Sequence, residues 1–154
     1  MIGEFTLSEL ASELGLSVTL SALKKGAAFS AVTTDSRNMS AGDLYVALKG
    51  ERFNGDEFVE EALTKGAVAA VTHQSDAQAD AQRLVVDDTL SALATLARLN
   101  RDRSSAKVIA LTGSQGKTSV KEMIGSILKA KAPTLITAEN LNNTIGVPLT
   151  LLRL

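Results

Sequence analysis

Apolar positions in the first two thirds of the chain follow either the alternating period of strands or the longer period of helices. Thr6 and Glu9 form a capping-box pattern, which predicts a short helix that ends near Gly15. Ser40–Asp43 is typical of a turn, and Lys49–Asp56 of a polar loop. Strands are predicted at Phe29–Thr34, Leu44–Leu48, Ala67–Val71 and Arg83–Val86, and helices at 57–65, capped by Asp56, and at 89–100.

The polar stretch Arg101–Lys107 separates this pattern from a second one and is predicted to link two domains, 1–103 and 107–154. The second pattern begins with the apolar run Val108–Leu111, which is typical of a buried strand in a parallel sheet. After it we predict a glycine-bounded loop, an amphipathic helix over 117–130, a strand at Leu135–Thr137 and a helix with Pro148 in its first turn.

Alternating strands and helices predict an α/β fold. We expect a small N-terminal α/β domain followed by the first βαβ unit of a P-loop ATPase-type domain. Because two strands do not make a stable sheet, the second unit is predicted to be truncated, with more protein expected to follow. Exposed sheet edges and leucines in residues 135–154 predict aggregation or exchange of segments with a second copy.

Composition excludes several classes of site. The 154 residues are 45% apolar and contain no cysteine, so disulfides, cysteine zinc sites and a thiol nucleophile are ruled out. The one histidine, His73, rules out an HExxH metal site, and 3% aromatics are too few for a nucleic-acid reader based on stacking. With a net charge of −1, no basic apolar leader and no long apolar run, we predict a cytoplasmic protein without nucleic-acid partners or membrane insertion.

Charge is divided unevenly between the two predicted domains. Residues 1–106 contain 10 basic and 15 acidic side chains, whereas residues 107–154 contain 6 and 2. The basic segment also contains the motif Thr112–Ser119, TGSQGKTS, between a predicted strand and a predicted helix. That is the context of a phosphate-binding loop, in which backbone N–H groups and the helix N-terminus face an anion. The spacing is the short G-x-x-G-K-T form, because Leu111 stands where the longer motif has its first glycine.

The motif predicts a role for each of its residues. Lys117 can reach the outer phosphates of a nucleotide, and the Thr118 hydroxyl can bind Mg²⁺. After Thr118 the acidic residues are Glu122 and Glu139, and neither ends an apolar strand. An acid that would complete the metal site is therefore missing from this chain. Nucleotide binding is predicted for Gly113, Ser114, Gln115, Gly116, Lys117, Thr118 and Ser119.

Longer stretches of the sequence resemble a known family. TGSQGKTSVKEM (112–123) and TAENLNNTIGVPLTLL (137–152) resemble the Mur ligases of peptidoglycan synthesis, as do TTDSR (33–37) and AGDLYVALKGERFNGDEF (41–58). The loop alone also fits the wider family, which includes folylpolyglutamate synthetases. The NLNNTIGVPLTLL and ALKGERF runs point to the branch that adds D-alanyl-D-alanine.

The resemblance implies an enzyme, a peptide-forming ligase that uses ATP and Mg²⁺. A carboxylate of UDP-N-acetylmuramoyl-tripeptide would attack the γ-phosphate, and the amine of D-Ala-D-Ala would displace phosphate from the acyl phosphate. Lys117 would be catalytic. The family's later metal-binding acid and histidine, its modified lysine and its C-terminal domain have no counterpart here, so we predict no turnover by this chain alone. Substrate binding is implied for Ser36, Arg37, Lys49, Gly50, Asn142, Asn143 and Thr144.

Simpler interpretations stay open beside these. Asp35–Arg37 suits a polar turn after a strand, Lys49 a solvated loop and Asn142 with Asn143 a turn. His73 is predicted to be a surface residue rather than a base. The chain could instead be a different P-loop enzyme, such as a small kinase or GTPase, or a stand-alone UDP-sugar-binding module.

Overall fold

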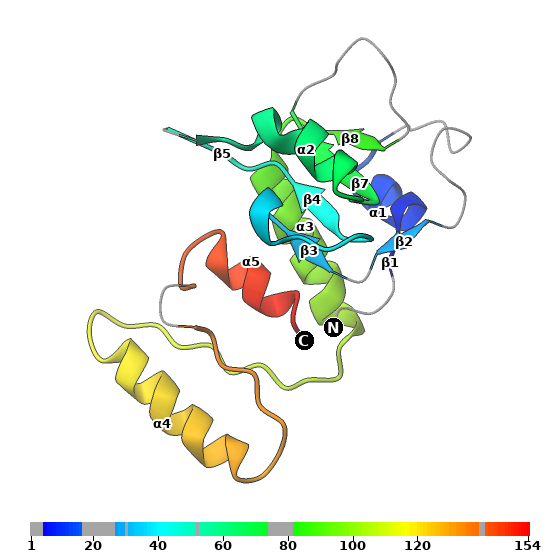
Figure 1. The fold of residues 1–154 in the computed structure, drawn as a ribbon. Coiled ribbons are helices and arrows are strands. Elements are labelled where there is room, and N and C mark those ends of the chain that lie inside the picture. The colour runs from blue at the N-terminus through cyan, green and yellow to red at the C-terminus, as the bar shows by residue number, and fades with distance from the viewer. Residues whose placement is uncertain (1–4, 17–26, 30, 52, 74–81, 139–140) are drawn as a thin grey trace.

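The computed structural model describes residues 5–16, 27–29, 31–51, 53–73, 82–138 and 141–154. A parallel sheet of four short strands lies at the centre of its N-terminal part (Figure 1). The order is β3 (Val32–Thr33), β4 (Leu44–Val46), β7 (Ala69–Thr72) and β8 (Arg83–Val85). Strands that are consecutive in this order pair in parallel, with helices between and around them. The predicted α/β class is therefore confirmed.

Helices cover both faces of this sheet: α1 (Leu7–Glu13) and α3 (Thr89–Arg103) on one, α2 (Val59–Thr64) on the other. Successive residues of a strand point to opposite faces. Leu44 and Val46 accordingly pack against α1 and α3, and Tyr45 packs against α2. The capping box that opens α1 is present as predicted, with the Glu9 amide donating to Thr6 Oγ1 and the Thr6 amide to the Glu9 carboxylate.

Two predictions about the strands of this part were wrong. The strand expected at Phe29–Thr34 is two strands, because β2 (Ala28–Phe29) pairs with β1 (Phe5–Thr6) while β3 joins the central sheet. Ser30 lies outside the described residues. The expected loop Lys49–Asp56 contains an antiparallel hairpin of β5 (Lys49–Gly50) and β6 (Phe53–Asn54). The β-prone run thus contributes strands to two different sheets. The polar run forms a hairpin because its backbone groups can pair whatever its side chains are.

Short 3₁₀ turns connect the strands to their neighbours. They are η1 (Ser36–Asn38), after β3, and η2 (Gly55–Phe58), which leads into α2. Asp56 was predicted to cap the following helix, but Asn54 caps η2 by accepting from the Asp56 amide at 3.3 Å. The expected linker Arg101–Lys107 begins as the last turn of α3, with Arg101 and Arg103 near the helix C-terminus, where positive charge is favourable.

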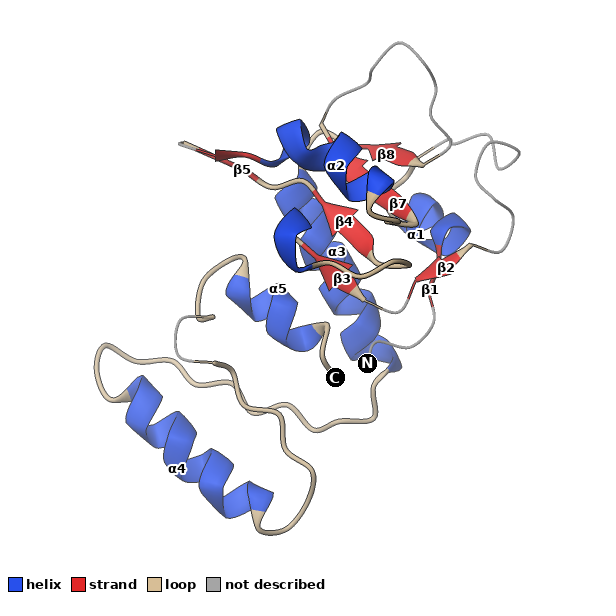
Figure 2. Cartoon of the chain, in the orientation of Figure 1, coloured by secondary structure: helices blue, strands red, loops and turns tan. Residues whose placement is uncertain are grey.

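The second part of the chain contains α4 (Lys117–Lys129), close to its predicted bounds, and two irregular segments (Figure 2). The strands predicted at Val108–Leu111 and Leu135–Thr137 do not form among the described residues. A strand is held by a ladder with a neighbour, and neither segment pairs with a described strand. Their apolar character predicts burial, yet Val108 is 47% exposed and Ile109 58% exposed.

Helix α5 (Gly146–Leu151) returns to the N-terminal part and packs along α3. Asn100 Nδ2 donates to the Leu151 carbonyl at 2.8 Å, and Leu152 joins the core at 6% exposure. The leucines at this end were predicted to be exposed, and here that prediction was wrong. Pro148 lies in the first turn of α5, as expected. None of the described helices is long and apolar enough to cross a membrane.

Candidate functional site

The loop before α4 turns at two glycines and leads directly into the helix. Gly113 has a φ of 144° and Gly116 a φ of 73°, conformations that side-chain-bearing residues rarely adopt. Helix α4 begins directly after Gly116 and has no side-chain cap. The amides of its first turn have no partner within the helix, so they are available to an anion and are favoured by the helix dipole.

Lys117 lies at the point where loop and helix meet. Its ammonium donates to the carbonyl of Gly113, so the side chain folds back across the loop. All seven predicted nucleotide-binding residues, Gly113 to Ser119, are exposed to solvent. The loop therefore offers glycine backbone, free amides and one ammonium group in a single stretch, which is the set that a phosphate requires.

The predicted metal ligand, Thr118, is exposed in the first turn of α4. Among the residues that the structure describes, no group of three or more histidine and acidic side chains is arranged to hold a metal ion. The site can therefore supply a hydroxyl ligand from Thr118, and the phosphates of a nucleotide would have to supply others.

Ser36 and Arg37 lie in η1, after the first strand of the central sheet. Arg37 donates to Asp35 Oδ1 and Oδ2 at 2.8 Å each, while its side chain is 83% exposed. These hydrogen bonds lower the pKa of Asp35 to about 2. Ser36 is buried, and its carbonyl accepts from Lys65 Nζ at 2.9 Å. Both residues thus belong to a capped turn, as the simpler interpretation expected, with the guanidinium presented to solvent.

Lys49 and Gly50 form β5, opposite Asn54 and Phe53 of β6. Both are exposed on a hairpin that projects from the sheet (Figure 1). Phe53 stacks on Phe58, with ring centroids 5.7 Å apart, and is itself 48% exposed. Lys49 is paired with Asn54 and Phe53 with Gly50, so the hairpin exposes the cation and the aromatic ring on opposite faces.

Asn142, Asn143 and Thr144 lie before α5 and are exposed. Asn143 Oδ1 accepts from the amides of Ile145 at 3.1 Å and Gly146 at 2.7 Å, a turn role that opens the helix. The three residues form one wall of an open groove of about 560 Å³. The other wall is the start of α3, with Asp88, Leu90, Ser91 and Ala94, and the floor includes Val147 and Pro148.

The structure brings together the residues within each predicted group. No contact recorded between described residues joins the phosphate loop, the η1 turn and the groove into one pocket. Sequence motifs predict which neighbouring residues form one group. They do not predict the distances between the phosphate loop, the η1 turn and the groove.

One buried polar cluster was missed by sequence reasoning. Asp56, only 7% exposed, accepts from Thr72 Oγ1 at 2.6 Å and from the His73 amide at 3.1 Å. The imidazole Nδ1 of His73 lies 3.2 Å from its second oxygen. This ties η2 to the end of β7, so His73 is half-buried beside an acid rather than a simple surface residue. The asparagine two positions before Asp56, a common turn former, was the available signal.

Comparison with known proteins is consistent with the motifs. The model of the Mur ligase family catalytic domain matches residues 28–101, and that of the Mur ligase middle domain matches residues 111–154. The UDP-N-acetylmuramoyl-tripeptide–D-alanyl-D-alanine ligase of Escherichia coli K12 is 52% identical over 124 residues. The ligase of that name from Bacillus subtilis is 42% identical over 123 residues. These matches cover about four fifths of this chain and 27% of each relative.

Solved structures agree. A crystal structure of MurF from Acinetobacter baumannii matches with a TM-score of 0.81 at 40% identity, covering 99% of this chain and 33% of that one. MurF from Thermotoga maritima in complex with ADP matches with a TM-score of 0.72 at 36% identity, covering 79% of this chain and 28% of that one. The chain thus spans about a third or less of the length of these relatives, and it belongs to the Mur ligase family.

Proposed function

We propose that this chain is the N-terminal portion of an ATP-dependent ligase that joins D-Ala-D-Ala to UDP-N-acetylmuramoyl-tripeptide, in the cytoplasm. The observation that supports this most is the uncapped start of α4, preceded by two glycines with positive φ and followed by Lys117 and Thr118. Relatives that are named for this reaction share 42–52% identity with the chain in the matches above. In this proposal residues 1–103 bind the UDP-sugar and residues 107–154 begin the ATP-binding domain.

In the proposed site, ATP would supply the phosphoryl group that activates the substrate carboxylate, and Mg²⁺ would offset the charge of the phosphates. The amides of Gly113–Ser119 hold the phosphates, and the helix dipole favours their charge. Lys117 would release the Gly113 carbonyl and turn to the outer phosphates, where it would stabilise charge as the γ-phosphoryl group passes to the substrate carboxylate and ADP leaves. Thr118 would contribute its hydroxyl to Mg²⁺. The catalytic role proposed for Lys117 is this electrostatic one.

The substrate side of the proposal uses the other predicted residues. The exposed charges of Arg37 and Lys49 suit the diphosphate of a UDP-sugar, and Ser36 and Gly50 flank them along the chain. Asn142, Asn143 and Thr144 offer amide and hydroxyl groups along a groove with an apolar floor. Such a wall suits a peptide, which presents both backbone polar groups and aliphatic side chains.

A second candidate is a stand-alone UDP-sugar-binding module. The packing of residues 5–103 favours it, because α1 and α3 on one face of the sheet and α2 on the other each bury an apolar cluster, whereas α4 exposes its apolar stripe. In that case the substrate would bind without any contribution from the phosphate loop.

Calorimetric titration distinguishes the two. We expect Mg-ATP to bind the chain and Lys117→Ala to weaken that binding at least about tenfold, as loss of a charge-assisted hydrogen bond predicts. Lys129→Ala, at the far end of α4, is the matched control and should leave the affinity unchanged. Binding of UDP-N-acetylmuramoyl-tripeptide without any binding of Mg-ATP would favour the module and contradict a working nucleotide site at the start of α4 in this chain.

A further inference from the structure

One face of α4 is formed by residues spaced four apart: Lys117, Lys121 and Gly125. Gly125 is the buried residue of this helix, and a Cβ at that position would overlap the Ile136 side chain. The chain that returns after α4 therefore lies directly against this face. The glycine leaves room for the Ile136 side chain, which a Cβ at this position would have to displace.

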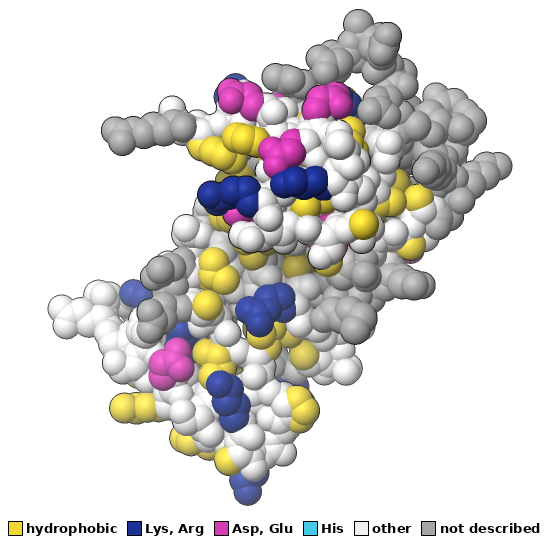
Figure 3. Space-filling view, viewed as in Figure 1, with side chains coloured by type: hydrophobic (Ala, Val, Ile, Leu, Met, Phe, Trp, Pro, Cys, Tyr) yellow, Lys and Arg dark blue, Asp and Glu magenta, His cyan; other side chains and the backbone are white. Residues whose placement is uncertain are grey.

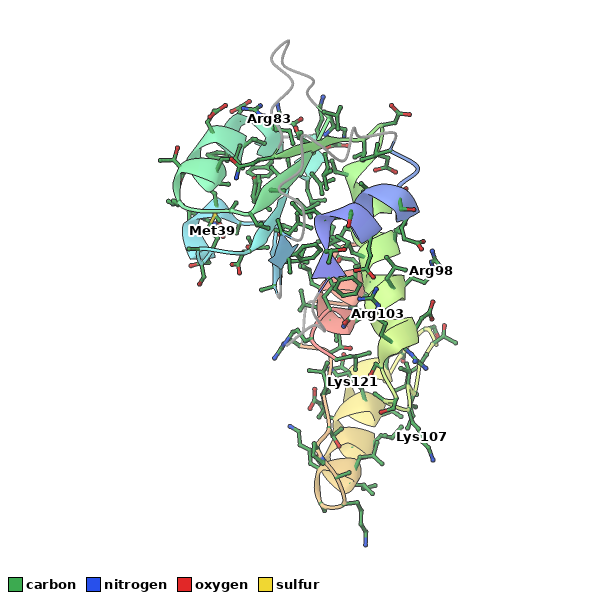
Figure 4. All side chains as sticks on the ribbon, turned by 90° about the vertical axis from the view of Figure 1, so that its right-hand side faces the viewer. Met39, Arg83, Arg98, Arg103, Lys107 and Lys121 are labelled. Carbon is green, nitrogen blue, oxygen red and sulfur yellow. The ribbon has the colours of Figure 1, made fainter. Side chains whose placement is uncertain are left out.

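Lys121 holds the returning chain against α4 at a point nearer the phosphate loop. Its ammonium donates to the Thr137 carbonyl at 2.6 Å and lies 3.1 Å from Glu122 Oε1, and the side chain is 22% exposed. Among the described residues, this is the one side-chain hydrogen bond that joins α4 to residues 131–138. In Figure 4, Lys121 lies near the start of α4, which is the end of the helix nearest α5.

From Thr137 a continuous series of contacts leads to the groove. The Leu141 amide donates to the Ala138 carbonyl at 3.0 Å. The Leu141 backbone packs so closely on Gly146 that a Cβ there would overlap it. The Gly146 amide in turn donates to Asn143 Oδ1 at 2.7 Å. Beyond Asn143, α5 is anchored on α3, so the Asn142–Thr144 segment is held from both sides.

We propose that Lys121 is a positioning residue, which holds the segment after α4 so that Asn142–Thr144 keep a fixed place relative to the phosphate loop. This rests on the proposed function, in which the loop binds ATP and Asn142–Thr144 meet its phosphates or the substrate. Lys117 contacts the loop, and Lys121, one turn further along the same face, contacts the segment that leads to the groove. Helix α4 thus connects the two candidate binding groups through two lysines.

The test compares the unmodified chain with Lys121→Met, which keeps the length of the side chain and removes its hydrogen bond. Lys121→Arg restores a donor, and Lys129→Met is the matched control on the same helix. Backbone amide NMR signals are followed at Gly113 and Gly116 for the loop and at Asn142–Thr144 for the groove, during titration with Mg-ATP. Without ligand, hydrogen exchange of the Leu141 amide reports on the connecting segment.

In the unmodified chain we expect both groups of amides to shift with Mg-ATP. In Lys121→Met the loop signals should still shift, the signals of Asn142–Thr144 should stay near their ligand-free positions, and the Leu141 amide should exchange about tenfold faster or more. Lys121→Arg should restore part of both effects, and Lys129→Met should match the unmodified chain. A purely structural lysine would instead change all amides of α4 together.

Two failures are distinguishable. If Gly113 and Gly116 do not respond to Mg-ATP in the unmodified chain, the proposed nucleotide site is wrong. If they respond while Asn142–Thr144 behave alike in the unmodified chain and Lys121→Met, the positioning role is wrong although the nucleotide site stands. If the Leu141 amide exchanges at the same rate in Lys121→Met as in the unmodified chain, the positioning role is wrong, whether or not Mg-ATP binds.

Discussion

Hydrophobic patterns are equally clear in the sheet-containing part, residues 5–103, and in the segment around α4, residues 108–138. The apolar residues are buried in the first and largely exposed in the second. In the first, Phe5, Leu44 and Leu93 are fully buried. In the second, Met123 and Ile127 are 66% and 67% exposed, and Figure 3 shows hydrophobic side chains at the surface over α4. A helical period predicts which residues share a face. Whether that face is buried depends on what packs against it, which is a property of the rest of the fold.

The same two regions differ in whether their residues serve folding or the proposed binding. The sheet part contains the core and a buried polar cluster around Asp56, while the phosphate loop stands on the segment with few buried contacts. Binding residues are often found on such exposed loops, because backbone amides that bind a ligand cannot also be used in a ladder. Mutations should therefore affect folding in one region and binding in the other.

The largest expected effect on stability comes from the core. Leu93→Ala removes a fully buried side chain between α3 and the sheet and should lower the free energy of unfolding by about 2–5 kcal/mol. Met123→Ala, on the exposed face of α4, should change it by less than about 0.5 kcal/mol. Urea denaturation followed by circular dichroism measures both. Equal losses would mean that α4 is packed as tightly as the core.

A smaller contrast comes from two glycines. A Cβ at Gly55 would lie 2.6 Å from the Leu48 carbonyl oxygen and 2.8 Å from the Leu48 nitrogen, and backbone cannot move aside easily. We expect Gly55→Ala to cost about 1–3 kcal/mol of unfolding free energy. Gly50→Ala, in the neighbouring β5–β6 hairpin with open space around it, is the control and should be nearly neutral.

Gly125→Ala extends that comparison to the second region. Its Cβ would meet the Ile136 side chain, which lies in an irregular segment and can shift. The free energy of unfolding should therefore change less than in Gly55→Ala, while hydrogen exchange in residues 131–138 speeds up. A thermal melt together with exchange of these amides tests this, and a loss as large as that of Gly55→Ala would refute it.

Asp56→Asn should cost about 1 kcal/mol, because the amide keeps one acceptor for Thr72 and His73 but loses the second oxygen that faces the imidazole. Glu57 is the next residue and is exposed, so Glu57→Gln is the control and should leave the free energy of unfolding unchanged. Denaturant unfolding of the two variants at pH 7 gives the difference. A neutral Asp56→Asn would mean that the His73 ring contact adds nothing.

The smallest effect is one of pH. The pKa of Asp35 is lowered from 3.8 to about 2, chiefly by hydrogen bonds from the Arg37 side chain and backbone. Because the folded pKa lies below the unfolded one, the contribution of this pair is present above pH 3.8 and is lost as the pH falls through about 2. The pair is exposed, so the effect on stability should be slight and weaker in salt.

The carboxyl carbon signal of Asp35, followed by NMR from pH 5 to strongly acidic conditions, checks this directly. Arg37→Gln should move the titration midpoint up towards 3.8. Arg98→Gln, whose side chain faces Glu13 and Asp102, should leave it in place. A midpoint near 3.8 in the unmodified chain would show that Arg37 does not hold Asp35 in solution.

Local signals in the sequence predicted the elements that depend on local interactions. The capping box of α1, the start of α4 after Gly116 and the first-turn Pro148 of α5 follow from hydrogen bonds and backbone angles within a few residues. The strands at 108–111 and 135–137 did not form, because a strand requires a partner that local patterns do not name. The docking of α5 on α3 depends on Asn100, 51 residues from Leu151, and spacing could not predict it.

The candidate site follows the same division. The turn at Gly113 and Gly116 before α4 could be predicted from the sequence, since its backbone geometry is local, and its binding of phosphate stays a prediction. The Asp56–His73 cluster and the contact of Lys121 with Thr137 depend on how distant segments pack, so residue identities alone did not reveal them.

Hydrogen exchange of the chain with and without Mg-ATP compares the two regions in one measurement. We expect the amides of β4 and β7 to exchange slowly and to be unaffected by the nucleotide, as core strands open only with the whole fold. The amides of α4 should exchange faster, and those from Gly113 to Ser119 should slow markedly when Mg-ATP is added. Protection by Mg-ATP that appears only in residues 36–50, or nowhere, would contradict nucleotide binding at the start of α4.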